Sequence, residues 1–214
     1  MVIPKATLKT LSGRWIALQI FWRIMHKRKV AVFDFDGTIT KRDTFLPFLL
    51  SYGSRKIIRS AFKTALQRKK GNFRNTLKAN ALREIFAGYP IERFLNDGIA
   101  YAESLHNKFQ KGTLDHIAGH KAQGHILVMV TASLASYTRP IGSLLGFDHV
   151  IGVELEAEAE FLTGEINGNN VRGSEKARLL REWLGEEPAE IWGYGNSRGD
   201  REMLAMADHQ VWVS

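Results

Sequence analysis

The stretch that decides the fold runs from Lys29 to Thr38 and reads KVAVFDFDGT. Its first part is a short run of apolar and β-branched residues, which is typical of a strand buried in a parallel sheet. Two aspartates follow directly, and Gly37 allows a sharp turn after them. Because ligands bind beyond the carboxyl ends of parallel strands, the sequence predicts a functional site at Asp34 and Asp36.

Apolar runs of the same kind recur further along the chain, at residues 126–130 (ILVMV), 190–193 (EIWG) and 210–213 (QVWV). Helical patterns separate them, over residues 112–123, 134–145, 174–184 and 200–207. This alternation predicts an α/β fold, with a Rossmann-like parallel sheet core and helices on both faces. Further short strands are expected over residues 147–156 and 159–166.

Residues 45–111 interrupt this alternation, because four helix-like stretches follow one another there without a strand run between them. They predict a helical insertion directly after the first strand. The α/β core is then expected to consist of residues 29–44 and 112–214. Residues 1–28 are expected to form a basic amphipathic helix that packs on the core or lies on a membrane surface.

Charge is distributed unevenly over the 214 residues, whose formal net charge is +8 from 30 Lys and Arg against 22 Asp and Glu. Residues 1–30 hold seven basic and no acidic residues, and residues 51–80 hold nine basic and no acidic residues. Such blocks indicate an anionic partner or, equally well, solvated helix faces. The absence of cysteine excludes disulfides, cysteine nucleophiles and thiolate metal sites.

Polar residues follow the predicted strands at the edge where Asp34 and Asp36 lie. Thr131 ends the second strand, and a glycine-rich stretch containing Asn196 and Asp200 follows the third. A carboxylate can act as a nucleophile towards phosphorus, and a second one beside it can act as general acid and base. Because carboxylates and phosphate repel one another, such a site needs a cation, and hard oxygen ligands suit Mg²⁺.

The sequence resembles the haloacid dehalogenase superfamily of phosphohydrolases over about residues 29–213, most closely its phosphoserine-phosphatase-like branch (subfamily IB type). Four ordered motifs carry this resemblance: residues 34–38 (DFDGT), 130–133 (VTAS), 173–176 (GSEK) and 193–200 (GYGNSRGD). The resemblance implies that the helical insertion is a cap over the site. It also implies an activity: hydrolysis of a phosphomonoester through an aspartyl-phosphate.

The resemblance further implies the role of individual residues. Asp34 would be the nucleophile, and Asp36 the general acid and base, whose main-chain carbonyl also binds Mg²⁺. Thr131, Ala132 and Lys176 would hold the phosphoryl group, and Asp43 would select the substrate. The metal ligands would be Asp34, Asp36, Asn196 and Asp200. The family usually has an acid where this chain has Asn196, so either the metal binds more weakly or Asp200 carries more of the binding.

The sequence therefore predicts a Mg²⁺-dependent phosphatase that acts on a small phosphorylated metabolite. The alternatives are a phospholipid head-group phosphatase docked on an anionic membrane, and a non-catalytic protein that binds a phosphorylated ligand. Nucleic acid is disfavoured as a partner, because no recognition motif accompanies the basic blocks. The expected location is the cytoplasm, with peripheral contact at the inner face of a membrane as the alternative. The oligomeric state is not predicted.

Overall fold

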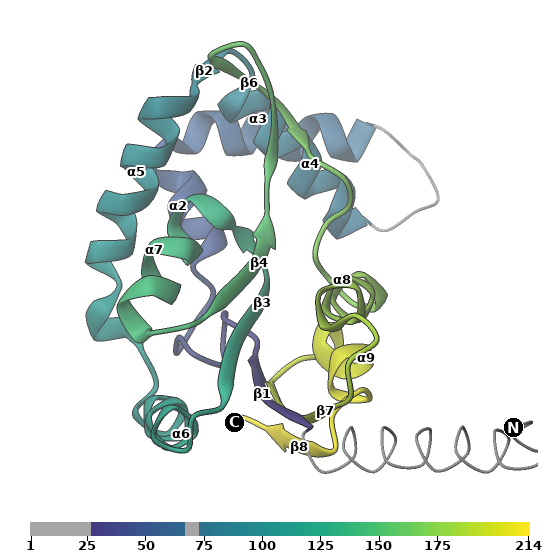
Figure 1. Ribbon diagram of the computed structural model, residues 1–214. Coiled ribbons are helices and arrows are strands. Elements are labelled where there is room, and N and C mark those ends of the chain that lie inside the picture. The colour runs from purple at the N-terminus through teal and green to yellow at the C-terminus, as the bar shows by residue number, and fades with distance from the viewer. Residues whose placement is uncertain (1–26, 67–72) are drawn as a thin grey trace, which may run out of the picture.

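A parallel sheet of five strands forms the centre of the protein in the computed structural model, which describes residues 27–66 and 73–214 (Figure 1). The strand order is β4-β3-β1-β7-β8, and every neighbouring pair is parallel. The predicted α/β fold with a Rossmann-like sheet is confirmed. The strands are β1 (Arg28–Phe33), β3 (Ile126–Leu134), β4 (His149–Val153), β7 (Ala189–Gly195) and β8 (His209–Trp212).

Helices cover both faces of this sheet, as the alternation of the sequence predicts. The helices α6 (Lys111–Ala122) and α7 (Ala135–Leu145) lie on one side, and α8 (Ser174–Leu184) and α9 (Arg201–Leu204) lie on the other (Figure 1). The apolar run of β1 is fully buried between them, from Val30 to Phe33. The predicted amphipathic helix over residues 1–28 falls almost entirely outside the described residues.

The cap follows the loop after β1, and it is mostly helical. Its helices are α2 (Phe45–Ser51), α3 (Ser54–Leu66), α4 (Phe73–Phe86) and α5 (Ile91–Ser104), followed by the short 3-10 helix η1 (His106–Lys108). A two-residue strand, β2 (Tyr89–Pro90), lies between α4 and α5. The sequence does not predict this strand, because two residues with a proline show no alternation of apolar and polar side chains.

The strand β2 belongs to a second, antiparallel sheet with the order β2-β6-β5. Its other strands are β5 (Leu155–Glu158) and β6 (Phe161–Ile166). The prediction of one strand over residues 147–156 is therefore wrong: the chain leaves the parallel sheet after β4, and β5 pairs with β6 instead. The hairpin β5–β6 thus connects the core to the cap.

The strand β6 passes directly over the backbone of α4, at Gly164. A β-carbon on Gly164 would lie 2.7 Å from the Cα of Arg83, and the φ angle of Gly164 is +84°. Both facts require glycine, because larger residues rarely adopt this backbone conformation and would collide with the helix. The glycine therefore fixes how closely the hairpin holds α4.

Aromatic side chains join the cap to the core on the other side of the molecule. The ring of Phe48 in α2 lies 5.0 Å from that of Tyr137 in α7, and Tyr101 of α5 packs 5.2 Å from the same tyrosine. The hydroxyl of Tyr101 also donates a hydrogen bond to the carbonyl of Thr44, at 2.8 Å. These contacts anchor the start of α2 above the sheet.

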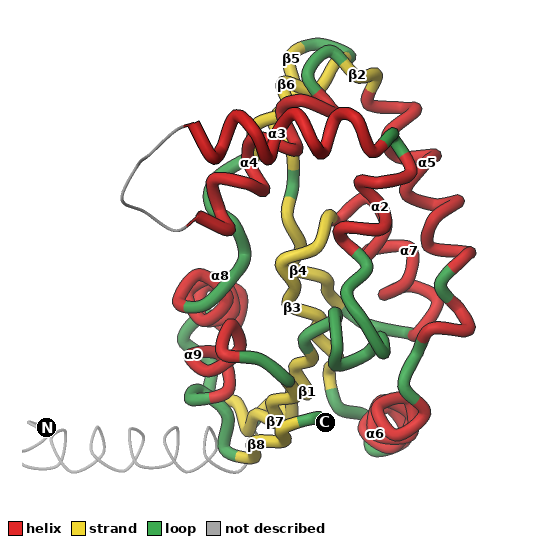
Figure 2. The backbone as a smooth tube through the Cα atoms, turned by 180° about the vertical axis from the view of Figure 1, so that it is seen from behind, coloured by secondary structure: helices red, strands yellow, loops and turns green. Residues whose placement is uncertain are grey.

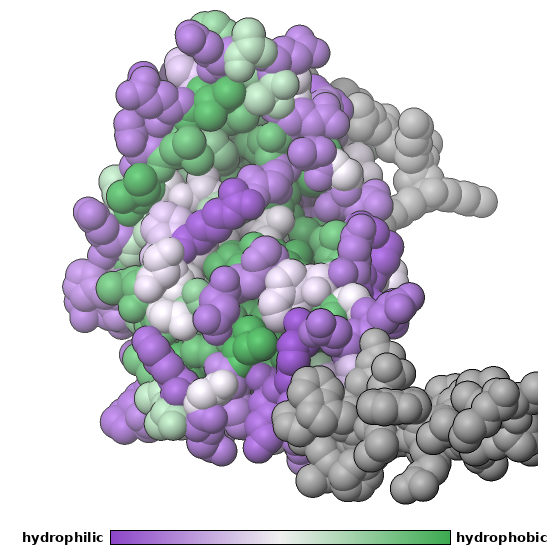
Figure 3. Space-filling model, viewed as in Figure 1, coloured by the Kyte–Doolittle hydropathy of each residue, from purple (hydrophilic) through white to green (hydrophobic). Residues whose placement is uncertain are grey.

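The surface is mostly hydrophilic on the face that Figure 3 shows, with small apolar areas between the polar residues. Large apolar side chains are also exposed on the cap: Leu46 and Leu50 on α2, and Ile58 and Phe62 on α3. Among the described residues, no helix is both long enough and apolar enough to span a lipid bilayer.

Candidate active site

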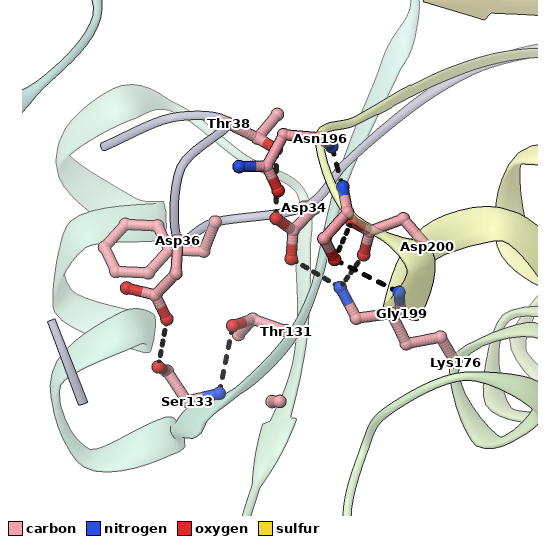
Figure 4. A network of polar contacts seen from close by, with 12 residues as sticks. Asp34, Asp36, Thr38, Thr131, Ser133, Lys176, Asn196, Gly199 and Asp200 are labelled. Atoms are coloured by element: carbon pink, nitrogen blue, oxygen red, sulfur yellow. Dashed lines mark hydrogen bonds and ion pairs between the residues drawn. The ribbon is translucent and has the colours of Figure 1, made fainter. Parts of the chain in front are cut away.

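Asp34 lies at the centre of a buried polar network directly after β1 (Figure 4). Its backbone N–H continues the pairing with β7 by donating to the carbonyl of Tyr194, at 2.9 Å. One carboxylate oxygen accepts a hydrogen bond from the hydroxyl of Thr38 at 2.9 Å, and the other forms an ion pair with Lys176. The end of the central strand thereby holds the carboxylate in one position.

Lys176 connects two carboxylates that are far apart in the sequence. It lies in the first turn of α8 and is 2 % exposed. Its ammonium group contacts Asp34 and also the Oδ1 of Asp200, at 2.7 Å. Since a buried charge is stable only with partners, this triad explains how all three ionised groups are held away from water.

Asp36 is held by three hydrogen bonds from outside the β1 strand. Its Oδ1 accepts from the backbone N–H and the hydroxyl of Thr44, both at 2.7 Å, and its Oδ2 accepts from the hydroxyl of Ser133. Thr44 lies at the start of α2, and Ser133 lies in β3. Both the cap and the core therefore orient this carboxyl group.

The strand β3 continues to Leu134, beyond the predicted end at Thr131, and its pairing with β4 is irregular between Val130 and Leu134. The hydroxyl oxygen of Thr131 accepts from the backbone N–H of Ser133 at 3.0 Å. No other described residue accepts the O–H proton of Thr131 itself, so this proton is available to a ligand. The motif of residues 130–133 still lies at the predicted edge of the sheet, where the side chain of Ser133 points to Asp36 (Figure 4).

The loop after β7 contributes Asn196 and Asp200. The Oδ2 of Asp200 accepts from the N–H and the hydroxyl of Ser197, at 2.9 and 2.8 Å, and the first of these bonds belongs to a capping box. Asn196 lies against the turn after β1, since a β-carbon on Gly37 would come 2.0 Å from its Nδ2. Figure 4 shows its amide group beside Asp34.

Electrostatics differ between the carboxyl groups of the site. Burial raises the pKa of Asp36 to about 6, although hydrogen bonds from Ser133 and Thr44 oppose the rise. Burial also raises the pKa of Asp34, against the effect of Lys176. For Asp200, burial acts upwards, but the ammonium group of Lys176 holds its pKa below the usual value. Lys176 thus holds Asp34 and Asp200 in place, and the raised pKa of Asp36 suits that carboxyl group to proton transfer near neutral pH.

Lys78 is a site residue that the sequence analysis missed. It extends from the cap helix α4, and its ammonium group donates to the carbonyl of Ala132 and to the Oδ1 of Asn170, both at 2.5 Å. Burial lowers its pKa to about 7, while the charge of Asp36 acts in the opposite direction. The basic block of residues 51–80 contains it, but nothing in the sequence distinguishes it from its exposed neighbours.

Asp43, the predicted specificity residue, is exposed at the rim of the site. Its Oδ2 accepts from the backbone N–H of Leu46 at 3.0 Å, so it caps the first turn of α2. Its charge acts on the pKa values of both Asp36 and Lys78. The structure therefore places it close to these two groups, although its own contact is structural.

The donors at this edge are suited to a hard cation. The described residues contain no group of three or more His, Cys, Asp or Glu side chains that could hold a metal ion. Both oxygens of Asp200 are already hydrogen bonded, whereas Asn196 lies beside Asp34 and the Asp36 turn. A mixed set of carboxylate, carbonyl and amide oxygens is the kind of set that fits Mg²⁺.

These features define a hydrolase site at the carboxyl edge of a Rossmann-like sheet, under a cap. A family model described as haloacid dehalogenase-like hydrolase matches residues 31–205. The chain belongs to this family, in its phosphoserine-phosphatase-like branch. The resemblance noted in the sequence is thus confirmed.

Known relatives support the same assignment. The chain is 33 % identical to Protein CicA of Caulobacter vibrioides over 196 residues, which cover 86 % of each chain. It is 24 % identical to a phosphoserine phosphatase of Archaeoglobus fulgidus over 200 residues, covering 91 % of this chain and 55 % of the relative.

Solved structures share the fold. A protein of unknown function from Bordetella pertussis Tohama I superposes with a TM-score of 0.70 at 21 % identity, over 87 % of this chain and 90 % of the other. A phosphoserine phosphatase in the form of a phospho-aspartyl intermediate analogue superposes with a TM-score of 0.59 at 19 % identity, over 87 % of both chains.

Proposed function

We propose that the protein is a Mg²⁺-dependent phosphatase that hydrolyses a small phosphorylated metabolite through an aspartyl-phosphate on Asp34. The observation that carries this proposal is the arrangement of the two aspartates. Asp34 is fixed between Lys176 and Thr38, and burial raises the pKa of Asp36 beside it to about 6. The similar proteins include phosphoserine phosphatases, and one of them is described as a phospho-aspartyl intermediate analogue, which supports the same chemistry.

In the first step, a carboxylate oxygen of Asp34 attacks phosphorus, and the bond from phosphorus to the leaving oxygen breaks. Asp36 begins the step protonated and gives its proton to the leaving alkoxide. Thr131 donates its free O–H proton to a phosphoryl oxygen, and Ala132 contributes its backbone. Lys176 neutralises part of the phosphoryl charge, as a cation already fixed in place.

In the second step, the carboxylate of Asp36 takes a proton from water. The water oxygen attacks phosphorus, the acyl-phosphate bond breaks, and Asp34 is regenerated as phosphate leaves. Mg²⁺ would be held by Asp34, the main-chain carbonyl of Asp36 and Asn196, with Asp200 orienting the surrounding loop. When bound, it supplies positive charge that offsets the repulsion between phosphate and the carboxylates.

Lys78 supports a substrate that carries a second negative charge. Its hydrogen bonds go to two neutral oxygens, so its charge has no carboxylate partner in contact among the described residues. A carboxylate or second phosphate on the substrate would supply that partner. Asp43, at the rim beside it, is suited to a positively charged or hydroxyl group of the same substrate.

The proposal is tested by a screen of phosphorylated metabolites with Mg²⁺, using Asp34→Asn as the blank and Asp115→Asn, an exposed substitution on α6, as the matched control. We expect Asp34→Asn to lose at least about 10³-fold in turnover, because the nucleophile is removed. Acid-quenched wild-type protein should carry phosphate on the peptide containing Asp34. Turnover by Asp34→Asn close to that of Asp115→Asn would refute the mechanism.

A further inference from the structure

The cap helix α3 has an unusual arrangement of side chains. Its outward side carries Ile58 and Phe62, which are 68 % and 66 % exposed. Its inward side carries Ser60 and Thr64, which are buried. Ile57 on the inward side packs against the core. An exposed apolar pair beside basic residues is a candidate for a binding surface.

Hydrogen bonds fix the orientation of this helix. The hydroxyl of Thr64 donates to the carbonyl of Ser60 at 2.8 Å and accepts from the Nδ2 of Asn80 in α4 at 2.9 Å. The hydroxyl of Ser60 donates to the carbonyl of Ile57 at 2.7 Å. A rotation that buried Ile58 and Phe62 would break the contact with α4 and expose these hydroxyls. These hydrogen bonds therefore hold the apolar side of α3 towards solvent.

Basic residues accompany the two apolar ones on α3, although the ammonium group of Lys56 also donates to the carbonyl of Ile85 in α4, at 3.5 Å. Arg55, Lys56 and Arg59 are exposed on the same helix, and α3 contains no acidic residue. Arg59 pairs with Glu84 of α4 at 2.9 Å, whereas Arg55 has no ion pair with another described residue. The adjacent helix α2 has no charged residue at all, and it exposes two leucines. Figure 2 shows α3 and α2 on the same face of the molecule.

We propose that this face, formed by the outward sides of α3 and α2, binds the surface of an anionic phospholipid bilayer. Apolar side chains next to basic ones are typical of helices that lie in a membrane interface, where each basic residue also attracts anionic lipid. An acidic head-group layer complements the charge of α3. The exposed leucines of α2 add apolar surface on the helix that precedes α3.

Docking of this kind would bring the active site to the membrane. The helix α4 packs against α3 through Asn80 and Thr64 and carries Lys78 into the site. The site would then draw its substrate from the layer next to the bilayer, where phosphorylated lipid head groups are one source. The docking surface does not depend on the proposed hydrolysis, because none of its residues contacts Asp34 or Asp36.

Co-sedimentation of the full chain with vesicles tests the proposal. The vesicles are phosphatidylcholine alone, or phosphatidylcholine with about 30 % phosphatidylglycerol. The test variant is Ile58→Ser with Phe62→Ser, and its matched control is Leu144→Ser, since Leu144 on α7 is 66 % exposed. For charge, Arg55→Glu is compared with Lys108→Glu, which is exposed on η1.

We expect wild type and both controls to bind the anionic vesicles, with the bound fraction decreasing as salt rises. The double variant and Arg55→Glu should each bind at least about fivefold less. Hydrolysis of p-nitrophenyl phosphate in the absence of vesicles should be equal in all five proteins, so that failure of docking and failure of catalysis are distinguishable. Absence of wild-type binding, equal binding to neutral vesicles, or a double variant that binds like Leu144→Ser would each overturn the proposal.

Discussion

Two lysines reach the same site, one from the core and one from the cap, and their surroundings differ. Lys176, from the core helix α8, contacts two carboxylates, and their charge raises its pKa although burial acts to lower it. Lys78, from the cap helix α4, donates to two neutral oxygens and lies over the ring of Phe45, without an ion pair to another described residue, and burial lowers its pKa to about 7. The core cation is therefore part of the folded structure, whereas the charge of the cap cation is available to a ligand.

The largest expected effect is that of Lys176→Met. Because it leaves Asp34 and Asp200 buried and unpaired, we expect it to reduce the free energy of unfolding by about 3–5 kcal/mol. Urea unfolding measures this loss. The matched control is Lys111→Met, which breaks the exposed ion pair with Asp115 and should cost less than about 1 kcal/mol. Equal losses in the two variants would contradict the structural role of Lys176.

Lys78→Met should affect substrate binding more than stability. For a substrate with a second negative charge we expect KM to rise about tenfold, the equivalent of one charge-assisted hydrogen bond, while kcat changes little. Lys78→Arg, which keeps the charge, should restore much of the binding. The measurement is KM and kcat for all three proteins on the best substrate of the screen.

The pH dependence of KM tests the same comparison. Since the pKa of Lys78 is lowered to about 7, its positive charge is present below pH 7 and is lost as the pH rises above that value. The KM of wild type should therefore rise between pH 7 and 9, and that of Lys78→Met should not. If KM changed with pH in the same way in both proteins, Lys78 would not contact the substrate.

Gly164→Ala should loosen the hairpin that holds the cap helix α4. A β-carbon there meets the backbone of Arg83, so we expect a loss of about 1–3 kcal/mol. Gly168→Ala is the matched control, because its φ angle is also positive, at +82°, but no atom lies within 4 Å of the added carbon. Thermal unfolding compares the two. If Gly164→Ala lost no more stability than Gly168→Ala, the contact between β6 and α4 would have room for a β-carbon.

Asn196→Asp should have the smallest effect on stability and a modest effect on the metal. An added negative charge should lower the dissociation constant for Mg²⁺ by about tenfold or less, if Asn196 is a direct ligand. Titration calorimetry with Mg²⁺ measures it, with the exposed Asn167→Asp as the control. An unchanged constant would remove Asn196 from the metal site.

The sequence predicts that Asp34, Thr131 and Asn196 share one edge of the sheet, because each lies at the carboxyl end of a strand of the parallel sheet. The position of Lys176 follows from the first turn of α8 instead.

The sequence does not predict the cap side of the site. Lys78 lies in a helix with many basic residues, and only tertiary packing separates it from them. The hydroxyl of Ser133 binds Asp36 across the site, a contact that the sequence does not predict, and α7 begins after Leu134 without a side-chain cap.

The sequence does not predict the second sheet either, because strand pairing also depends on tertiary structure. Alternation of side chains locates a strand but does not say which sheet it joins, so β4 and β5 were combined into one strand. The strand β2 is too short for any periodic signal. Its existence depends on β6, more than 70 residues later in the chain, which supplies the partner residues Leu162 and Phe161.

The pairing of β2 with β6 gives the protein a natural reporter of cap movement. The amide of Gly88 donates to the carbonyl of Leu162 at 2.8 Å, and the amide of Ile91 donates to that of Glu160 at 3.0 Å. Both bonds join the cap to the hairpin from the core, so separation of the two must break them. The hydrogen-exchange rates of these two amides therefore time the opening of the cap, independently of any substrate.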